Sequence, residues 1–394
     1  MHTLMDITFT DAVWEILLSK AFEKTIPDKI VDKFHLGKVR RELYDKIASG
    51  EFSINPPVQK FIPKEDGSKR MILVNSPEER LLLSAVCMAY NYLYGDRLSK
   101  ASKAYTAGLS CAKTVREVAK QNLSGYKLDL SKYFDSVPIE VINSCLDELD
   151  TGTELDKVVR RYYNDDTIIV GGKPVKHFKS LAQGCAVASF LANYVLKDVD
   201  EAMLSRCQYY CRYCDDMVLL GDGADEAFEY LKYCLAELGL SLNPNKVQRI
   251  EPGMDWTFLG FGIKANGEVQ VADKSFAKRK TEVKAVCRKY RGNLKKMIRG
   301  VKRVFLNPEA PCYSWIYVEA SAVNDSARIK ELDKYCKDTI RACMTGSYNY
   351  TSNIHKIPNA ELRKAGWVSL NHLYEVARID RTLFEQEVYA TCSK

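Results

Sequence analysis

Ten residues, Arg212 to Gly221, place two adjacent carboxylates between aromatic residues and an apolar run. The sequence is RYCDDMVLLG, so Asp215 and Asp216 directly precede four apolar residues. Adjacent anions repel each other and are costly to remove from water unless a cation offsets them. The apolar run is typical of a core strand, and residues 207–220 are predicted to form strand, turn and strand. A chain that folds in this way needs a cation at the turn.

A third carboxylate suits the same site. The segment YKLDLSKYFDSVP places Asp129 at the end of a short predicted strand, 126–128. Magnesium prefers oxygen ligands and is commonly held by one or two carboxylates together with substrate phosphates. Two such ions can activate an attacking oxygen and stabilise a leaving one in phosphoryl displacement. We therefore predict that Asp129, Asp215 and Asp216 hold two Mg²⁺ ions, with Mn²⁺ as an alternative; the competing interpretation is a solvated acidic turn.

The rest of the chain predicts a mixture of helices and hairpins. The expected elements are a helical region at 1–55, hairpins at 58–74 (around Asp66-Gly67) and 167–178 (around Gly171-Gly172), and helices at 77–98, 181–196 and 226–239. Paired prolines at 56–57 disfavour continuation of the first helical region. The pattern indicates an α+β fold, with an antiparallel sheet and helices on one face.

Several motifs in this order resemble those of reverse transcriptases. DLSKYFDSV looks like their first palm motif, QGCAVASFLANYVL like the Gln-Gly helix motif, and YCDD like the Tyr-x-Asp-Asp tip. LNPNK and FLGF are similar to the motifs that follow, and IPKEDGSKRMILV to the upstream segment that grips the triphosphate. The resemblance covers residues 60–263 and implies an RNA-directed DNA polymerase, which is a nucleotidyltransferase.

The resemblance also implies a right-hand polymerase fold with fingers, palm and thumb. The expected regions are an N-terminal helical extension at 1–55, fingers at 56–120, a palm at 121–263 and a helical thumb with the C-terminal region at 264–394. A fingers insertion is expected within the palm at about 138–180. The palm would consist of an antiparallel sheet with helices.

Five further residues receive nucleotide-handling roles from the resemblance. Lys64 and Arg70 flank the first hairpin turn and would contact the triphosphate, since guanidinium binds phosphate oxygens bidentately and ammonium acts as a point charge. Phe134 would exclude a 2′-hydroxyl, so deoxynucleotides are the expected substrate. Gln183 and Gly184 would open the second helix motif, where glycine permits close backbone approach to a ligand. The competing interpretations are a solvated hairpin face and packing in the palm.

Lys246, in the fourth palm motif, would donate a proton to the leaving pyrophosphate or neutralise it. A surface lysine after a turn is the competing interpretation. The sequence departs from the family at Ala188-Ser189, where most relatives have Ser-Pro, so template contact or nucleotide fit at this helix could differ.

Basic residues are concentrated near the start of the predicted thumb. Residues 274–303 contain 13 Lys and Arg and one acid, Glu282, whereas the whole chain has a net charge of +7. Apolar residues recur there at helical spacing: Val283, Cys287, Tyr290, Leu294, Ile298, Val301 and Phe305. A helix of this kind would present Lys284, Arg288, Lys295 and Arg299 to the phosphates of an RNA template and DNA primer. An exposed amphipathic helix without a partner is the alternative.

The 13 cysteines are scattered, so we expect reduced thiols. Cys207, Cys211 and Cys214 have CxxxCxxC spacing, but a strand would point them to opposite faces, which argues against an iron–sulfur cluster. The sequence shows neither a signal peptide nor a membrane span, which predicts a cytoplasmic protein without membrane partners.

Three functional hypotheses stay open. The tail ELRKAGWVSLNHLYEVARID is similar to that of bacterial defence-associated reverse transcriptases of the unknown groups, which are related to retron, group II intron and abortive-infection enzymes. It favours templated DNA synthesis in antiphage defence, with a noncoding RNA. The second hypothesis is template-independent or protein-primed synthesis by the same site, and the third is a non-catalytic RNA-binding protein. A second protein or a homo-oligomer is left open.

Overall fold

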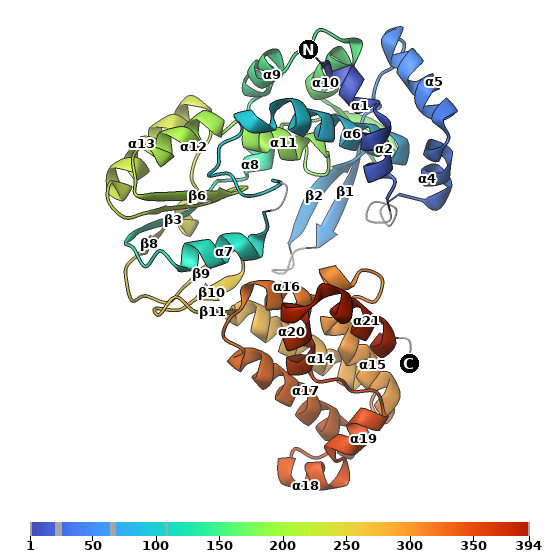
Figure 1. Cartoon of the computed structure of the whole chain (residues 1–394), viewed down its shortest axis with the longest axis vertical. Helices are drawn as coiled ribbons and strands as arrows, with labels where there is room; N and C mark the ends of the chain where they lie inside the picture. The colour runs from blue at the N-terminus through green and yellow to red at the C-terminus, as the bar shows by residue number, and fades with distance from the viewer. Residues whose placement is uncertain (1, 20–25, 64–67, 107–108, 393–394) are drawn as a thin grey trace. The chain divides into compact units, whose positions relative to one another are not determined.

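The computed structural model describes residues 2–19, 26–63, 68–106 and 109–392, and the chain divides into two compact units (Figure 1). The first comprises residues 1–107 and 125–249, and the second comprises 108–124 and 250–394. Helices and strands occur in both units, which confirms the mixed helix-and-sheet class. These compact units do not test the expected division into N-terminal extension, fingers, palm and thumb. That division, at 1–55, 56–120, 121–263 and 264–394, stays a prediction.

Among the described residues, four short helices begin the first unit: α1 (Leu4–Thr8), α2 (Asp11–Leu17), α4 (Asp28–His35) and α5 (Gly37–Ala48). The long helix α6 (Pro77–Tyr94) and η1 (Gly95–Arg97) follow, and α1 and α2 pack on α6. Ser76 caps α6 through a reciprocal capping box with Glu79, and Pro77 occupies the first helical position. Trp14 is fully buried and stacks on Phe34 at a ring-centroid distance of 5.3 Å. The predicted helical character of 1–55 is confirmed for its described residues.

One sheet combines the two predicted hairpins. Strands β1 (Val58–Pro63) and β2 (Lys69–Val74) pair antiparallel, as do β4 (Thr167–Val170) and β5 (Lys173–Lys176). The turn around Asp66-Gly67 lies outside the described residues. The order is β2-β1-β4-β5, and β1 pairs with β4 in parallel. This sheet is therefore mixed, because the second hairpin docks beside the first from a distant part of the chain.

A second sheet carries the acidic residues. Its order is β6 (Tyr209–Tyr213), β7 (Asp216–Leu220), β3 (Gly125–Asp129) and β8 (Gln248–Ile250), and in it β7 pairs antiparallel with both β6 and β3. Met217 to Leu220 are all buried, as expected for a strand inside a covered sheet. Helices α12 (Lys197–Leu204) and α13 (Ala224–Glu237) pack on this sheet (Figure 1). The predicted strand-turn-strand at 207–220 is confirmed.

The apolar helix expected at 181–196 begins later than predicted. It is α11 (Val187–Tyr194), and it follows α8 (Tyr133–Ser136), α9 (Ile139–Glu148) and α10 (Glu154–Asn164) along the chain. Ser180, Ala182 and Gly184 have φ values of 49°, 61° and 107°, and left-handed residues do not continue a helix. Gln183 and Gly184 therefore lie in a loop before the helix and do not open it. This loop lies against β2, since the Leu73 amide donates to the Gln183 carbonyl at 2.7 Å.

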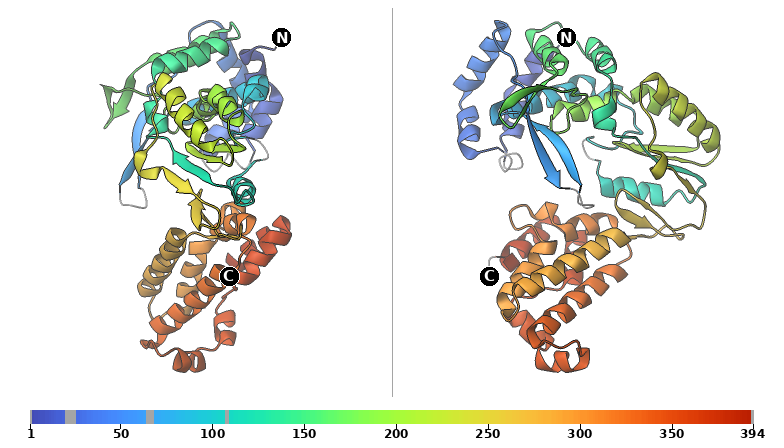
Figure 2. Two further views of the ribbon diagram at one scale, coloured as in Figure 1. Left: turned by 90° about the vertical axis from the view of Figure 1, so that its left-hand side faces the viewer. Right: turned by 180° about the vertical axis from the view of Figure 1, so that it is seen from behind.

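The second unit consists of a small sheet and a helical body (Figure 2). The sheet contains β9 (Trp256–Phe258), β10 (Phe261–Ile263) and β11 (Val269–Val271). The helices are α7 (Cys111–Ala119), α14 (Asp273–Lys289), α15 (Leu294–Phe305), η3 (Pro311–Tyr313), α16 (Trp315–Ala322), α17 (Ala327–Thr345), α18 (Tyr350–Lys356), α19 (Asn359–Lys364), α20 (Leu370–Ile379) and α21 (Arg381–Cys392). Across the described residues, each helix is too short or too polar to cross a membrane.

The amphipathic stretch at 283–305 is two helices and not one. Helix α14 ends at Lys289 and α15 begins at Leu294, with Gly292 between them at φ 83°. The apolar spacing still identifies the packed side, because Val283, Cys287, Ile298, Val301 and Phe305 are all fully buried.

Gly184 provides a test of the loop that docks on β2. A Cβ atom at this position would lie 2.6 Å from the Leu73 carbonyl oxygen, so both the backbone angle and the contact require glycine. We expect Gly184→Ala to lower the free energy of unfolding of the first unit by about 2–4 kcal/mol, which combines left-handed strain with overpacking.

The matched control is Gly171→Ala. Gly171 also has positive φ, at 58°, but nothing lies within 4 Å of an added Cβ. Urea unfolding should show a loss of only about 1 kcal/mol for this variant, because left-handed strain acts alone. Equal losses in the two variants would contradict the contact with β2.

Candidate active site

The turn between β6 and β7 holds the adjacent acids at one end of the second sheet. Strand β6 ends at Tyr213 and β7 begins at Asp216, so Cys214 and Asp215 alone make the connection. Tyr213 pairs with Asp216 across the hairpin. Cys214 has a φ of 61°, a left-handed conformation that is costly for a residue with a side chain. The turn is therefore tight and needs support from its surroundings.

Strand β3 brings the third acid to the same end of the sheet. Asp129 pairs directly with Asp216, and the Leu130 amide donates to the Asp215 carbonyl at 3.0 Å. On the other side of β3, the Asn243 amide donates to the Asp129 carbonyl at 2.8 Å. The backbone pairing of β3 and β7 thus brings together the three acids that the sequence nominated.

The acids repel one another. Asp129 is buried, with 4% exposure, while Asp215 and Asp216 are half-buried. Burial and the charges of Asp215 and Asp129 raise the pKa of Asp216 to about 6. Burial is the largest cause of this shift and the two neighbouring carboxylates add to it, so the ionised form of Asp216 is disfavoured without a cation.

Two lysines partly offset the charge of these acids. The Lys246 ammonium in η2 (Pro244–Lys246) lies 2.6 Å from the Asp129 Oδ2 atom. Partial burial opposes its ionisation, but the hydrogen bond to Asp129 and the charges of all three acids raise the pKa of Lys246. Lys127 in β3 is affected in the opposite direction, because burial lowers its pKa despite the attraction of Asp216 and Asp129.

The donor chemistry fits a divalent cation. Carboxylate oxygens are the ligands that Mg²⁺ prefers, and a bound cation would offset both the burial and the mutual repulsion that raise the pKa of Asp216. Among the residues that the structure describes, no group of three or more His, Cys, Asp or Glu side chains is arranged to hold a metal ion. Asp129, Asp215 and Asp216 therefore fit by type and charge, and their role as ligands stays a prediction.

Hydrogen bonds join helix α8, which carries Phe134, to the loop that carries Gln183 and Gly184. Phe134 in α8 is half-buried beside Tyr133, with ring centroids 5.8 Å apart, and its carbonyl accepts from the Leu181 amide at 3.2 Å. The Gln183 amide nitrogen donates to Asp135 at 3.4 Å. The close approach that Gly184 allows in the structure is to the Leu73 backbone in β2.

Arg70 is exposed in β2, opposite Ile62 of β1. It shares its strand with Leu73, which contacts the loop of Gln183 and Gly184. Lys64 lies outside the described residues. The loop before α11 therefore links β2 to the helix of Phe134.

The predicted nucleic-acid contacts lie in the second unit. Lys284 and Arg288 are exposed on α14, and Lys295 and Arg299 are exposed on α15. The opposite sides of both helices are buried, so these cations face away from their own packed side. Their contact with phosphates stays a prediction.

The cysteine motif does not form a cluster. The Cys207 thiol donates to the Met203 and Tyr209 carbonyls, each at 3.4 Å, whereas Cys214 contacts the Tyr105 hydroxyl at 3.6 Å. Cys211 is fully buried. All 13 cysteines lie within the described residues, and none of them is in a disulfide bond, as the sequence predicted.

Tyr105 is a neighbour of the site that the sequence reasoning missed. Its hydroxyl touches the Cys214 thiol, its φ is 60°, and its side chain is 53% exposed. Tyr105 precedes the acidic turn by more than 100 residues, so no local pattern links them. The only available signal is its place beside Gly108 in a polar segment typical of a loop.

The sheet, the acidic turn and the order of motifs define a nucleic-acid polymerase of the reverse transcriptase class. The chain belongs to the reverse transcriptase (RNA-dependent DNA polymerase) family, whose pattern matches residues 62–263, more than half of the chain. The activity for which this family is named is RNA-directed DNA synthesis, a nucleotidyltransferase reaction. Members of this family use divalent metals such as Mg²⁺ and bind a nucleic-acid template and primer.

Similar proteins occur in two yeasts. A putative COX1/OXI3 intron 1 protein of Saccharomyces cerevisiae is 24% identical over 164 residues, which cover 40% of this chain and 19% of that protein. A putative COX1/OXI3 intron 2 protein of the same yeast is 25% identical over 169 residues, 41% of this chain and 19% of that protein. An uncharacterized 91 kDa protein in a cob intron of Schizosaccharomyces pombe is 23% identical over 164 residues, which cover 41% of this chain and 20% of that protein. The match thus spans about a fifth of each relative.

The raised pKa of Asp216 predicts a pH-dependent stability of the metal-free protein. Its pKa of about 6 in the folded state exceeds the ordinary value of 3.8, so ionisation is harder in the folded protein than in the unfolded chain. The contribution of Asp216 is therefore fully present below about pH 4 and is lost as pH rises through 6. In EDTA, Asp216→Asn should not show this loss, and its melting temperature should exceed that of the unmodified protein above pH 6.

Added Mg²⁺ should raise the melting temperature of the unmodified protein more at pH 8 than at pH 5, because the ion binds the ionised carboxylates. Asp222→Asn, which removes an exposed acid beyond the other end of β7, is the control and should leave both effects intact. If the melting temperatures of Asp216→Asn and the unmodified protein change with pH by the same amount from pH 4 to 8, the raised pKa of Asp216 is contradicted.

Proposed function

We propose that the chain extends a DNA strand on an RNA template by two-metal phosphoryl transfer, with Asp129, Asp215 and Asp216 as the metal ligands. The supporting observation is the pairing of Asp129 with Asp216, beside a turn that carries Asp215, at one end of a sheet. When bound, divalent ions would activate the attacking 3′-hydroxyl and stabilise the leaving oxygen.

The chain's own residues would bind and orient the substrates. Arg70 is exposed at the start of β2, where a guanidinium can grip phosphate oxygens bidentately. Lys246 is held in its charged form by Asp129, which suits it to neutralise the leaving pyrophosphate. Because the raised pKa makes the ammonium a weaker acid, proton donation to the pyrophosphate is the less favoured of its two expected roles. Lys64 would add a second cation for the triphosphate.

Phe134 would select the sugar. Its ring is half-buried on α8, and its carbonyl fixes the loop that carries Gln183 and Gly184. A rigid aromatic ring at the sugar would leave no room for a 2′-hydroxyl, so deoxynucleotides would be accepted and ribonucleotides rejected. Gln183 and Gly184 would border the same nucleotide pocket.

The basic helices of the second unit would hold the nucleic acid. Lys284, Arg288, Lys295 and Arg299 are exposed cations on two consecutive helices with buried apolar sides. Such a surface would bind phosphates without reading sequence, and its affinity would fall with added salt.

The RNA template has two candidate sources. The similarity of the C-terminal segment to defence-associated enzymes favours a dedicated noncoding RNA in bacterial antiphage defence. The yeast relatives are named for introns, which favours an intron RNA as the alternative. Sequencing the RNA that copurifies with the chain distinguishes the two.

Incorporation of labelled deoxynucleotides tests the polymerase assignment. With Mg²⁺ and an RNA template–DNA primer, Asp215→Ala should lose activity about 1000-fold or more, because metal stabilisation is worth several kcal/mol and each 1.36 kcal/mol is tenfold. The control, Asp222→Asn, should retain activity. Full incorporation by Asp215→Ala would overturn the assignment of the site.

The same assay separates the alternatives. Synthesis that persists after nuclease treatment and without added template would favour template-independent or protein-primed extension. RNA binding without incorporation that is sensitive to Asp215→Ala would favour the non-catalytic RNA-binding protein.

Phe134→Ala tests sugar selection. Removing the ring should reduce the preference for deoxynucleotides over ribonucleotides by about 10–100-fold, the discrimination that pocket shape typically supplies for one small group. Phe134→Tyr keeps the ring and should keep the preference. The measurement is kcat/KM for matched deoxy- and ribonucleotides, and an unchanged ratio in Phe134→Ala would show that Phe134 only packs.

A further inference from the structure

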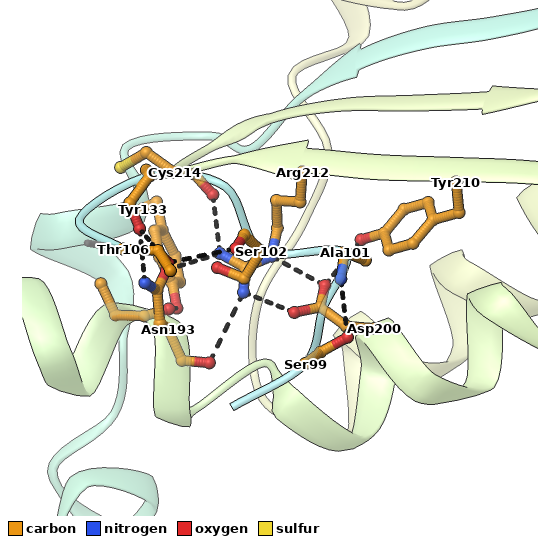
Figure 3. A network of polar contacts seen from close by, with 12 residues as sticks. Ser99, Ala101, Ser102, Thr106, Tyr133, Asn193, Asp200, Tyr210, Arg212 and Cys214 are labelled. Atoms are coloured by element: carbon orange, nitrogen blue, oxygen red, sulfur yellow. Dashed lines mark hydrogen bonds and ion pairs between the residues drawn. The ribbon is translucent and has the colours of Figure 1, made fainter. Parts of the chain in front are cut away.

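A buried ion pair contacts the acidic turn of Cys214 and Asp215, and the proposed function gives this pair no role. Arg212 in β6 and Asp200 in α12 are both fully buried. The Arg212 Nε and Nη2 atoms donate to the two Asp200 carboxylate oxygens at 2.8 and 2.6 Å, and Tyr210 donates its hydroxyl to the same carboxylate at 2.8 Å (Figure 3). This bidentate geometry uses two of the five guanidinium N–H donors and leaves Nη1 for other partners.

The remaining nitrogen reaches the acidic turn. Arg212 Nη1 donates to the Cys214 carbonyl oxygen at 3.0 Å (Figure 3). Cys214 has left-handed backbone, and the peptide whose oxygen is held is the one that leads into Asp215. A conformation that is unfavourable for a residue with a Cβ persists only where neighbouring contacts determine it. Arg212 supplies such a contact from the interior.

The same guanidinium also contacts helix α11 through Asn193. Nη1 and Nη2 approach the Asn193 side-chain and backbone oxygens at 3.3 and 3.5 Å, and the Asn193 amide nitrogen donates to the Ala104 carbonyl at 2.7 Å. The Arg212 backbone is hydrogen-bonded to Ala101 and Lys103. The Arg212 side chain therefore joins α11 to α12, while its backbone and the Asn193 side chain bond the loop before Tyr105.

A buried ion pair can exist for stability alone. The hydrogen bond from Arg212 to the Cys214 carbonyl distinguishes a role in positioning the turn from a role in stability alone. This bond holds the turn and adds nothing to the pairing of the charges. Tyr210 offers the comparison, since its hydroxyl bonds Asp200 without touching the turn.

We propose that Arg212, oriented by Asp200, is a positioning residue that holds the Cys214–Asp215 turn in the conformation required for metal binding. The inference rests on the proposed role of Asp215 as a metal ligand. Groups that orient metal ligands typically change metal affinity or activity about 10–100-fold when they are removed.

The test is the Mg²⁺ dependence of incorporation by Arg212→Lys. Lysine keeps a positive charge beside Asp200, but a single ammonium lacks the fork that spans both Asp200 and the Cys214 carbonyl. The Mg²⁺ concentration for half-maximal incorporation should rise about 10-fold or more. Tyr210→Phe should leave it unchanged, even where its melting temperature falls.

Two additions keep the test decisive. The double variant Arg212→Met with Asp200→Asn removes both charges and leaves no unpaired buried ion, so it is expected to fold where Arg212→Lys does not. It should show the same shift in Mg²⁺ requirement. Direct titration with Mn²⁺, followed by electron paramagnetic resonance, should show weaker binding in both Arg212 variants at temperatures where they are folded.

An unchanged Mg²⁺ requirement in the folded Arg212 variants would overturn the positioning role, as would an equal shift in Tyr210→Phe. Asp215→Ala separates this failure from that of the proposed function. If Asp215→Ala is inactive while the Arg212 variants behave normally, only the positioning role fails. If Asp215→Ala retains incorporation, the assignment of Asp215 fails, and the positioning role fails with it.

Discussion

The antiparallel pairing of β3 with β7 is the interaction on which the site depends. It places Leu128 opposite Met217 and Asp129 opposite Asp216, so apolar packing and acidic pairing share one register. A slip of one residue would turn every side chain of β3 to the other face of the sheet. Burial of the apolar residues therefore sets the positions of the acids. The acids therefore repel one another at one end of the sheet, because the packing of the apolar residues along the two strands fixes the register that brings them together.

Different contacts manage the charge and the geometry of that repulsion. The Lys246 ammonium, in η2, pairs with the Asp129 carboxylate. Arg212 pairs its charge with Asp200 and donates a hydrogen bond to the backbone of the turn. A surface cation can exchange partners during a reaction cycle, while a fully buried pair stays in place. Under the proposed function, this division would let the site bind and release metal and nucleotide while the turn keeps its conformation.

The loop before α11 shows how far local reasoning extends. Its apolar residues predicted a helix over 181–196, yet Ser180, Ala182 and Gly184 adopt left-handed backbone. The residues between them bond elsewhere, since the Leu181 amide donates to the Phe134 carbonyl of α8 and the Gln183 carbonyl accepts from β2. Similarly, apolar spacing identified the buried side of α14 and α15 but did not reveal the break between them. The hairpins and the strand-turn-strand were predictable, because alternation and turn residues act over a few positions. The parallel contact of β1 with β4 was not, because it joins segments about 100 residues apart.

The sequence by itself determined the kind of protein and the acids to examine. Asp129, Asp215 and Asp216 occur in short motifs whose order is readable along the chain. Only the tertiary structure decided which groups surround them, such as Lys246 on Asp129, Tyr105 on Cys214, and Arg212 joined to Asp200 and Asn193. The physical reason is the range of each signal. Strand and turn patterns depend on neighbouring residues, whereas the partner of a buried charge depends on which distant segments the packed core brings together.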